Sequence, residues 1–230
     1  MVSRKLTKSI AAGVAAIAIA GASYGIVSAT SSGSSAAASS GTAGGPGSGG
    51  GSNARSGPAA GGSSGTASGV STSGFTLTTA AGQKVIVNEA SATTYEKGTS
   101  AASASVVTTG EPVLVLGTTS GTTITATQVI VQPTGGGSAA SSAVVPFQPG
   151  APTTSKQVGQ IPATFSQGSG MIVSGAAANK ATESALAAYP GGIVDRVVEL
   201  ADGVYNVHYI GVNWPHHVFV NQDFTVIGAE

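Results

Sequence analysis

The side chains that are able to do chemistry gather in the last quarter of this 230-residue chain. That stretch holds all the histidines and three aspartates: His208, His216, His217, Asp195, Asp202 and Asp223. Imidazoles beside carboxylates are typical of zinc sites and of acid–base catalysis. Neighbouring side chains on a strand point to opposite faces, so His216 and His217 are not expected to bind one ion. His208, next to tyrosines, is expected to be an ordinary hydrogen-bonded surface histidine. We therefore predict no metal ion and no cofactor.

Hydrolytic chemistry is also disfavoured. Serine is abundant, but no Gly-x-Ser-x-Gly elbow lies between a predicted strand and a helix, and Gly168-Ser169-Gly170 falls in a predicted linker. Phosphate-loop and dinucleotide fingerprints are missing from the sequence. The chain has no cysteine, which excludes disulfides, thiolate metal sites and a cysteine nucleophile. The sequence predicts a protein that is not an enzyme.

A helix and a small sheet are expected to position these residues. Alanines at helical spacing from Ala178 to Ala185 predict a helix that ends at Pro190-Gly191. Strand-like segments follow, divided by the Asp202-Gly203 hairpin signal and by a reversal at residues 213–216. Alternation places Tyr205 and Tyr209 on one face and His208 on the other. We predict an α+β module of one helix on an antiparallel sheet over residues 174–230.

This module resembles the PepSY family. The resemblance rests on a helix ending in Tyr-Pro-Gly and three strand motifs, at Ala187–Gly191, Val194–Val197, Asp202–Val207 and Val218–Val226. The chain departs from the family at Asn213-Trp214-Pro215-His216, where an Asp-Gly hairpin tip is usual. PepSY domains are non-catalytic and are associated with peptidase propeptides and envelope proteins. The resemblance thus implies a binding or regulatory module that modulates a peptidase or another envelope partner.

The loop at residues 213–216, where the chain differs from the family pattern, is part of the predicted contact region. We expect a partner to bind at Trp214, His216, His217, Tyr205 and Tyr209. Two interpretations of Trp214 stay open: the indole folds back into the core, or it is an exposed aromatic anchor of the kind that dominates interfaces.

Residues 75–132 predict a second folded domain. Short Val/Ile/Thr-rich segments separated by glycine turns are typical of a small all-β barrel or meander. The segments Gly110–Gly117 and Ala126–Val131 resemble an uncharacterised family of small exported β-barrel domains. This motif consists of turn glycines and core valines, so it implies a fold and no ligand. The carboxylates Glu89, Glu96 and Glu111 are expected to be solvated.

The remaining segments are predicted to be an export signal and two linkers. Residues 1–29 combine a basic start, a small-residue apolar run and Val27-Ser28-Ala29, the features of a cleaved signal peptide. Residues 9–29 as an uncleaved membrane anchor remain the alternative. The Gly/Ser/Ala-rich residues 30–74 predict a disordered tether, and the Pro/Gly-rich residues 133–173 a second linker.

The net charge of the chain limits the classes of molecule that it is expected to bind. The chain has nine basic and nine acidic residues, and removal of the N-terminal segment with Arg4, Lys5 and Lys8 leaves six against nine, a net charge of −3. A mildly acidic mature chain disfavours nucleic acid, which requires clustered Lys and Arg. We expect a secreted or cell-envelope protein with a regulatory module; the alternative is a structural or adhesive envelope component.

Overall fold

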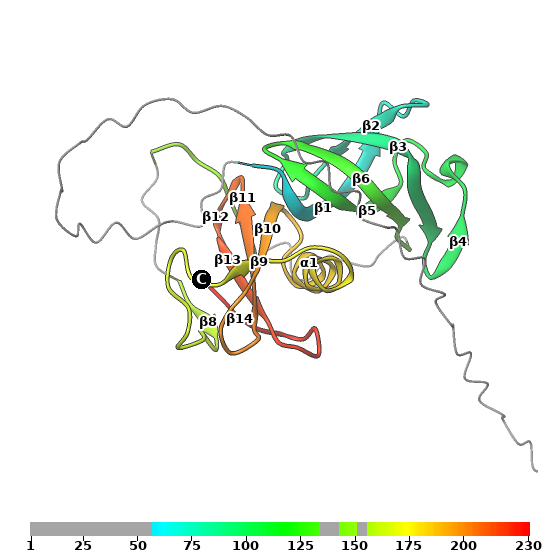
Figure 1. Cartoon of the computed structure of the whole chain (residues 1–230). Helices are drawn as coiled ribbons and strands as arrows, with labels where there is room; N and C mark the ends of the chain where they lie inside the picture. Colours follow the sequence, from blue (N-terminus) through cyan, green and yellow to red (C-terminus); the bar gives the residue numbers. More distant parts are fainter. Residues whose placement is uncertain (1–56, 134–142, 151–155) are drawn as a thin grey trace, which may run out of the picture. The chain divides into compact units, whose positions relative to one another are not determined.

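The structure is a computed structural model that describes residues 57–133, 143–150 and 156–230 (Figure 1). All of these belong to one compact unit, Ser48–Glu230. The predicted signal segment (residues 1–29) and the predicted tether up to residue 56 lie outside the described residues. Within the described ranges, no helix combines the length and apolar character needed to cross a membrane.

The first half of the described chain folds into a closed barrel of five strands (Figure 1). They are β1 (Ala59–Ser68), β2 (Gly74–Thr78), β3 (Lys84–Lys97), β5 (Pro112–Ser120) and β6 (Thr123–Val131). They follow the order β2-β3-β6-β5-β1, and β1 also pairs with β2, which closes the ring. β3 and β6 run parallel, and the other barrel pairs are antiparallel. Strand β4 (Ser100–Ala102) and a 3₁₀ turn (Ala104–Val106) complete this half. The predicted small all-β fold is confirmed, in its barrel form.

The interior of the barrel is filled by the inward-pointing side chains of its strands. Every second residue of β3 and β6 points inward, so Val85, Val87 and Ile124 are almost completely buried. Ile86, between two of these valines, is 53% exposed. The β-branched side chains that predicted strands are therefore also the barrel core.

Strand β1 lies inside the predicted tether, and this part of the prediction is wrong. Its sequence, AAGGSSGTAS, has no large apolar side chain, which is why composition indicated disorder. The glycines instead allow close backbone approach: a Cβ on Gly61 would collide with the carbonyl oxygen of Val194, and one on Gly65 with that of Thr78. Small residues are required here because β1 is squeezed between other strands.

The C-terminal half is a helix on an antiparallel sheet, as predicted. Helix α1 (Ala176–Ala188) lies across strands β10 (Ile193–Glu199), β11 (Tyr205–Ile210), β13 (His217–Val220) and β14 (Val226–Ala229). Its buried face is mostly alanine, with Ala178, Ala181 and Ala185 at 0% exposure. Small side chains let the helix backbone lie close to the sheet, where it covers Val197, Val207 and Val218.

The two halves share one sheet. β1 pairs with β5 of the barrel along its length and with β10 through Gly62↔Val194 and Ser63↔Ile193. The Ile193 side chain belongs to the barrel core. Leu114 and Leu116, on the outer face of β5, belong to the core around α1. The domains predicted at 75–132 and 174–230 therefore pack as one unit.

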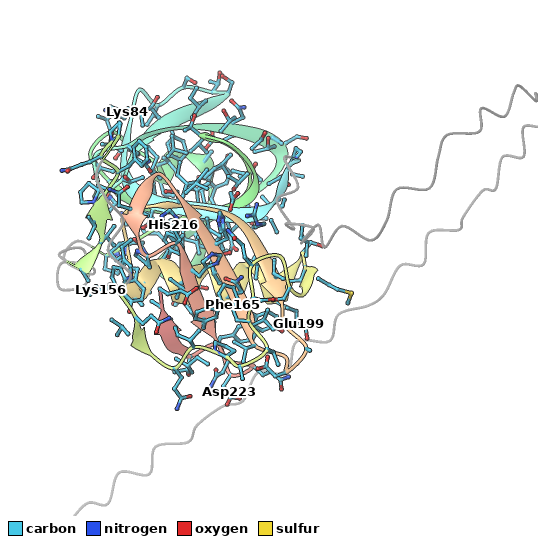
Figure 2. The ribbon with its side chains drawn as sticks, turned by 90° about the vertical axis from the view of Figure 1, so that its left-hand side faces the viewer. Lys84, Lys156, Phe165, Glu199, His216 and Asp223 are labelled. Carbon is cyan, nitrogen blue, oxygen red and sulfur yellow. The ribbon has the colours of Figure 1, made fainter. Side chains whose placement is uncertain are left out.

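The described part of the predicted linker (residues 133–173) is built into the same body. β7 (Val145–Pro146) pairs with β12 (Val212–Trp214), β8 (Val158–Gly159) with β14, and β9 (Met171–Ile172) with β10. We call residues 156–173 the covering segment. It runs over the sheet face opposite α1 and carries Phe165 onto that face (Figure 2).

Candidate binding site

The sheet face opposite α1 carries a row of polar and aromatic side chains. Strand alternation sends Val207 and Tyr209 toward α1 and leaves Asn206 and His208 on the other side. The neighbouring strand β13 contributes His217 and Phe219 to this second face, where the Phe165 ring lies 4.9 Å and 4.8 Å from their ring centroids. The covering segment thereby shields part of the row from solvent.

His208 and His217 form a cross-strand pair at the centre of this face. They occupy directly opposite positions on β11 and β13. The adjacent pair is hydrogen-bonded, with Tyr209 N donating to His216 O at 2.7 Å. Hydrogen-bonded and non-hydrogen-bonded pairs alternate, so His208 and His217 occupy the non-hydrogen-bonded type, whose side chains are closest. Their ring centroids are 5.0 Å apart with an interplanar angle of 61°.

Each imidazole is held by an oxygen acceptor. His208 Nδ1 lies 2.6 Å from Asp195 Oδ1, and His217 Nδ1 lies 2.9 Å from Asn206 Oδ1. The second carboxylate oxygen of Asp195 is 3.3 Å from Arg196 Nη1. Carboxylate and amide oxygens accept hydrogen bonds, so both Nδ1 atoms donate and each neutral ring keeps its lone pair on Nε2.

Burial keeps His217 uncharged near neutral pH. Desolvation is the main cause that lowers the pKa of His217 to about 4, and the charges of His208, His216 and Arg196 lower it further. Asp195 acts in the opposite direction and raises it. His217 is therefore a neutral imidazole at neutral pH.

A pocket of about 740 Å³ opens beside the histidine pair. The side chains around it include His208, His216, His217, Trp214, Lys156 and Glu230. Figure 2 shows His216, Lys156 and Phe165 around this region of the molecule. Asn213 with Gln157 and Gln167 supplies amides to the wall. Convergent polar groups around a concave surface are the usual mark of a binding site.

A second pocket, of about 780 Å³, lies where β1 and α1 begin. Its walls are formed largely by glycine, alanine and threonine, for example Gly117, Thr118 and Ala176, and they include no titratable side chain. The pocket beside the histidines is therefore the stronger candidate.

Trp214 is part of the core, so the first interpretation of this residue fits the structure. Its side chain is 4% exposed, and Nε1 donates to Lys156 O at 2.7 Å. The Tyr189 ring packs edge-on at 5.4 Å, and Lys156 Nζ lies 4.2 Å above the indole. Trp214 therefore supports the pocket wall and fastens the covering segment to it.

The other predicted contact residues divide into two groups. His216 and His217 both border the pocket, because β13 begins only at His217 and His216 belongs to the preceding loop. Only His217 lies in a strand, so the strand alternation on which the expectation for these two residues rests does not apply to them, and the expectation that they do not share an ion stays a prediction. Tyr209 is fully buried under α1, and Tyr205 stacks on Phe224 at 5.7 Å, so neither tyrosine borders the pocket.

Sequence inspection missed several members of the site. His208 is hydrogen-bonded, as expected, through Nδ1 to Asp195 Oδ1, and it also borders the pocket, which the sequence did not indicate. Asp195 is among the carboxylates that the sequence places with the histidines, but neither its pairing with His208 nor the pairing of Asn206 with His217 can be predicted from residue type. Lys156 stood in a predicted linker, and nothing local indicated that it would pack on Trp214.

The groups that border the pocket are imidazole, ammonium, carboxylate and amide side chains, together with the rings of Phe165 and Trp214. The described residues that border it include no serine, threonine or cysteine to serve as a nucleophile beside His208. Nor do the described ranges contain a group of three or more His, Asp or Glu side chains placed to hold a metal ion. Asp202 accepts a hydrogen bond from Thr164 Oγ1 at 2.8 Å, away from the histidines.

Comparisons with known proteins return no match: no family model, no curated protein and no solved structure corresponds to this chain. The resemblance to PepSY domains therefore stays a prediction from the residues quoted above.

Proposed function

We propose that the protein is an exported component of the cell envelope whose pocket beside His208, His216 and His217 binds a peptidase or another envelope protein, without catalysis of its own. The observation that carries this proposal is the pocket itself. It combines fixed imidazoles, a cation at Lys156 and amide side chains around an open concavity. These groups suit polar side chains and backbone of a protein partner.

Exposed apolar residues close to the pocket support a protein partner. Val145 is 42% exposed and pairs with Trp214 across β7 and β12, while Val158 is also 42% exposed and pairs with Ala229. Phe147, close to Val145 in sequence, is 59% exposed. Exposed apolar side chains next to polar groups are common at protein interfaces.

The proposed location rests on the N-terminal sequence. A basic start followed by a small-residue apolar run and Val27-Ser28-Ala29 favours export with cleavage before Thr30, and retention through residues 9–29 is the alternative. N-terminal sequencing of protein from the envelope and the medium separates these outcomes, because cleavage gives Thr30 and retention leaves Met1 or Val2 with the membrane fraction.

The binding proposal is tested with the chain from Thr30 to Glu230, immobilised and exposed to envelope extract. We expect stoichiometric capture of a peptidase, and we expect Lys156→Ala and His216→Ala to weaken this capture at least about tenfold. The matched control is Lys84→Ala, a barrel lysine whose Nζ donates only to Thr78 Oγ1 at the surface. Retention on purified wall polymer that all three variants preserve would instead indicate a structural or adhesive component.

A further inference from the structure

The paired histidines carry the supporting contacts that metal-binding histidines have. A histidine that ligates a metal almost always donates its other ring N–H to a carboxylate or another oxygen acceptor, which fixes the ring. His208 does this toward Asp195 and His217 toward Asn206, at 2.6 Å and 2.9 Å. Both imidazoles border the pocket, whereas Asp195 and Asn206 do not. The acceptors thus lie behind the rings.

The spacing of the rings suits one shared ion. A transition ion sits about 2.0–2.1 Å from a ligating imidazole nitrogen, which places the ring centroid about 3.2 Å from the ion. Two such rings that subtend about 90–110° at the ion have centroids about 4.5–5.2 Å apart. The His208 and His217 centroids are 5.0 Å apart. The backbone register therefore sets a centroid separation that is compatible with joint ligation.

The ligating atoms are available. Among the described residues, no hydrogen bond reaches Nε2 of His208 or His217, and neither atom belongs to the buried polar atoms left without a partner.

We propose that His208 and His217 bind one divalent first-row transition ion through their Nε2 atoms, with Cu²⁺ held more tightly than Zn²⁺. Imidazole suits both ions, and affinity for nitrogen sites rises toward copper along the first row. Mg²⁺ and Ca²⁺ are excluded because they require oxygen ligands. This site goes beyond the proposed partner binding and does not depend on it.

The site is expected to be open. Two protein ligands leave the remaining coordination positions to water or to a donor group of a molecule in the pocket. No third histidine or carboxylate of the described chain stands in place to close it. An ion held this way exchanges readily, unlike the ion of a structural zinc site.

The test is a calorimetric titration of the chain from Thr30 to Glu230 with Cu²⁺ at neutral pH, in the absence of any partner. The chain has three histidines, so three single variants examine every imidazole. We expect one Cu²⁺ per chain and at least about a tenfold to hundredfold loss of affinity in His208→Ala and in His217→Ala. Lys84→Ala, on the barrel surface, is the matched control and should bind as the unchanged chain does, and His216→Ala should lose less affinity than the other two histidine variants.

Two further measurements guard against unfolding and adventitious binding. Asp195→Asn keeps a hydrogen-bonding side chain behind His208 but removes its charge, and it should weaken Cu²⁺ binding about 10–100-fold while melting remains cooperative. The electron paramagnetic resonance spectrum of the Cu²⁺ complex should show two imidazole nitrogens. Binding that survives in the double variant His208→Ala/His217→Ala, or that is lost equally in His216→Ala, would overturn the proposal. Equal affinities for Cu²⁺ and Mg²⁺ would overturn it as well.

Discussion

Ser63 of strand β1 donates a hydrogen bond from its Oγ to the carbonyl oxygen of Gly192, 2.9 Å away and 129 positions further along the chain. Ser63 is fully buried, so loss of the hydroxyl leaves a carbonyl without that partner. We expect Ser63→Ala to lower the free energy of unfolding by about 1–3 kcal/mol, measured by urea denaturation. Ser68→Ala, which removes a longer, partly exposed bond to Thr76 O, should cost less. Equal losses in the two variants would mean that the buried Ser63 hydrogen bond stabilises the protein no more than the partly exposed Ser68 bond does.

Gly61 tests whether β1 needs its small residues. A Cβ at this position would meet the Val194 carbonyl and lie 2.9 Å from Thr119 Oγ1. We expect Gly61→Ala to destabilise the protein by about 1–3 kcal/mol through overpacking, measured by thermal melting. Gly57→Ala is the control, since a Cβ there has no neighbour within 4 Å. An unchanged melting temperature in Gly61→Ala would show that β1 does not pair with β10.

Trp214 should behave as a core residue. Trp214→Ala removes a 4%-exposed side chain and should cost about 3–5 kcal/mol. Trp214→Phe keeps most of the packing but loses the bond from Nε1 to Lys156 O, so it should cost less. Trp214 is the only tryptophan, and its fluorescence should be blue-shifted in the native protein. Red-shifted emission together with an unchanged melting temperature would contradict the buried position.

The low pKa of His217 predicts acid lability. The unfolded chain takes up this proton near pH 6.5, but the folded protein resists it until about pH 4. The contribution of His217 to stability is thus complete above pH 6.5 and is lost as the pH falls toward 4, by at most about 3 kcal/mol. Urea denaturation of chelator-treated protein at several pH values measures this loss. His217→Gln, which does not titrate, should show a much flatter profile between pH 6.5 and 4.

Phe165 should hold the covering segment in place. Phe165→Ala removes the ring that packs on His217 and Phe219, and the loss should be about 1–3 kcal/mol because the side chain is only half-buried. Hydrogen exchange of residues 156–173 should accelerate while the barrel strands stay protected. Phe147→Ala, at a 59%-exposed position, should change stability by less than about 0.5 kcal/mol. Uniform acceleration over the whole chain would indicate global destabilisation instead.

The predictable parts of this fold are those in which side-chain pattern and structure share one cause. The alternating valines of β3 and the spacing of the alanines in α1 predict directly which face of each element is buried. β1 gave no such signal, because close backbone approach selects glycine and serine, which are also the residues of flexible tethers. Composition alone does not separate the two cases.

The contacts of the histidine pair could not be predicted from the local sequence pattern, for a different reason. The register of β10 against β11 shifts between Val194 and Arg196, so Asp195 is an extra residue in the strand. This bulge brings the Asp195 carboxylate to His208. A bulge position is set by the whole sheet, whereas the alternation of Tyr205 and Tyr209 is set by the strand itself. Alternation placed these tyrosines on a common face but did not show that α1 would cover it.

The pairing of β1 with both β5 and β10 also determines when its two edges can be paired during synthesis of the chain. During synthesis the barrel strands are complete once Val131 has been made, but the edge of β1 at Gly62 and Ser63 waits for β10, much later in the chain. Until then an unpaired strand edge is open to other chains, and such edges promote aggregation. A ribosome-bound or truncated chain that ends before Ile193 should therefore be a chaperone client.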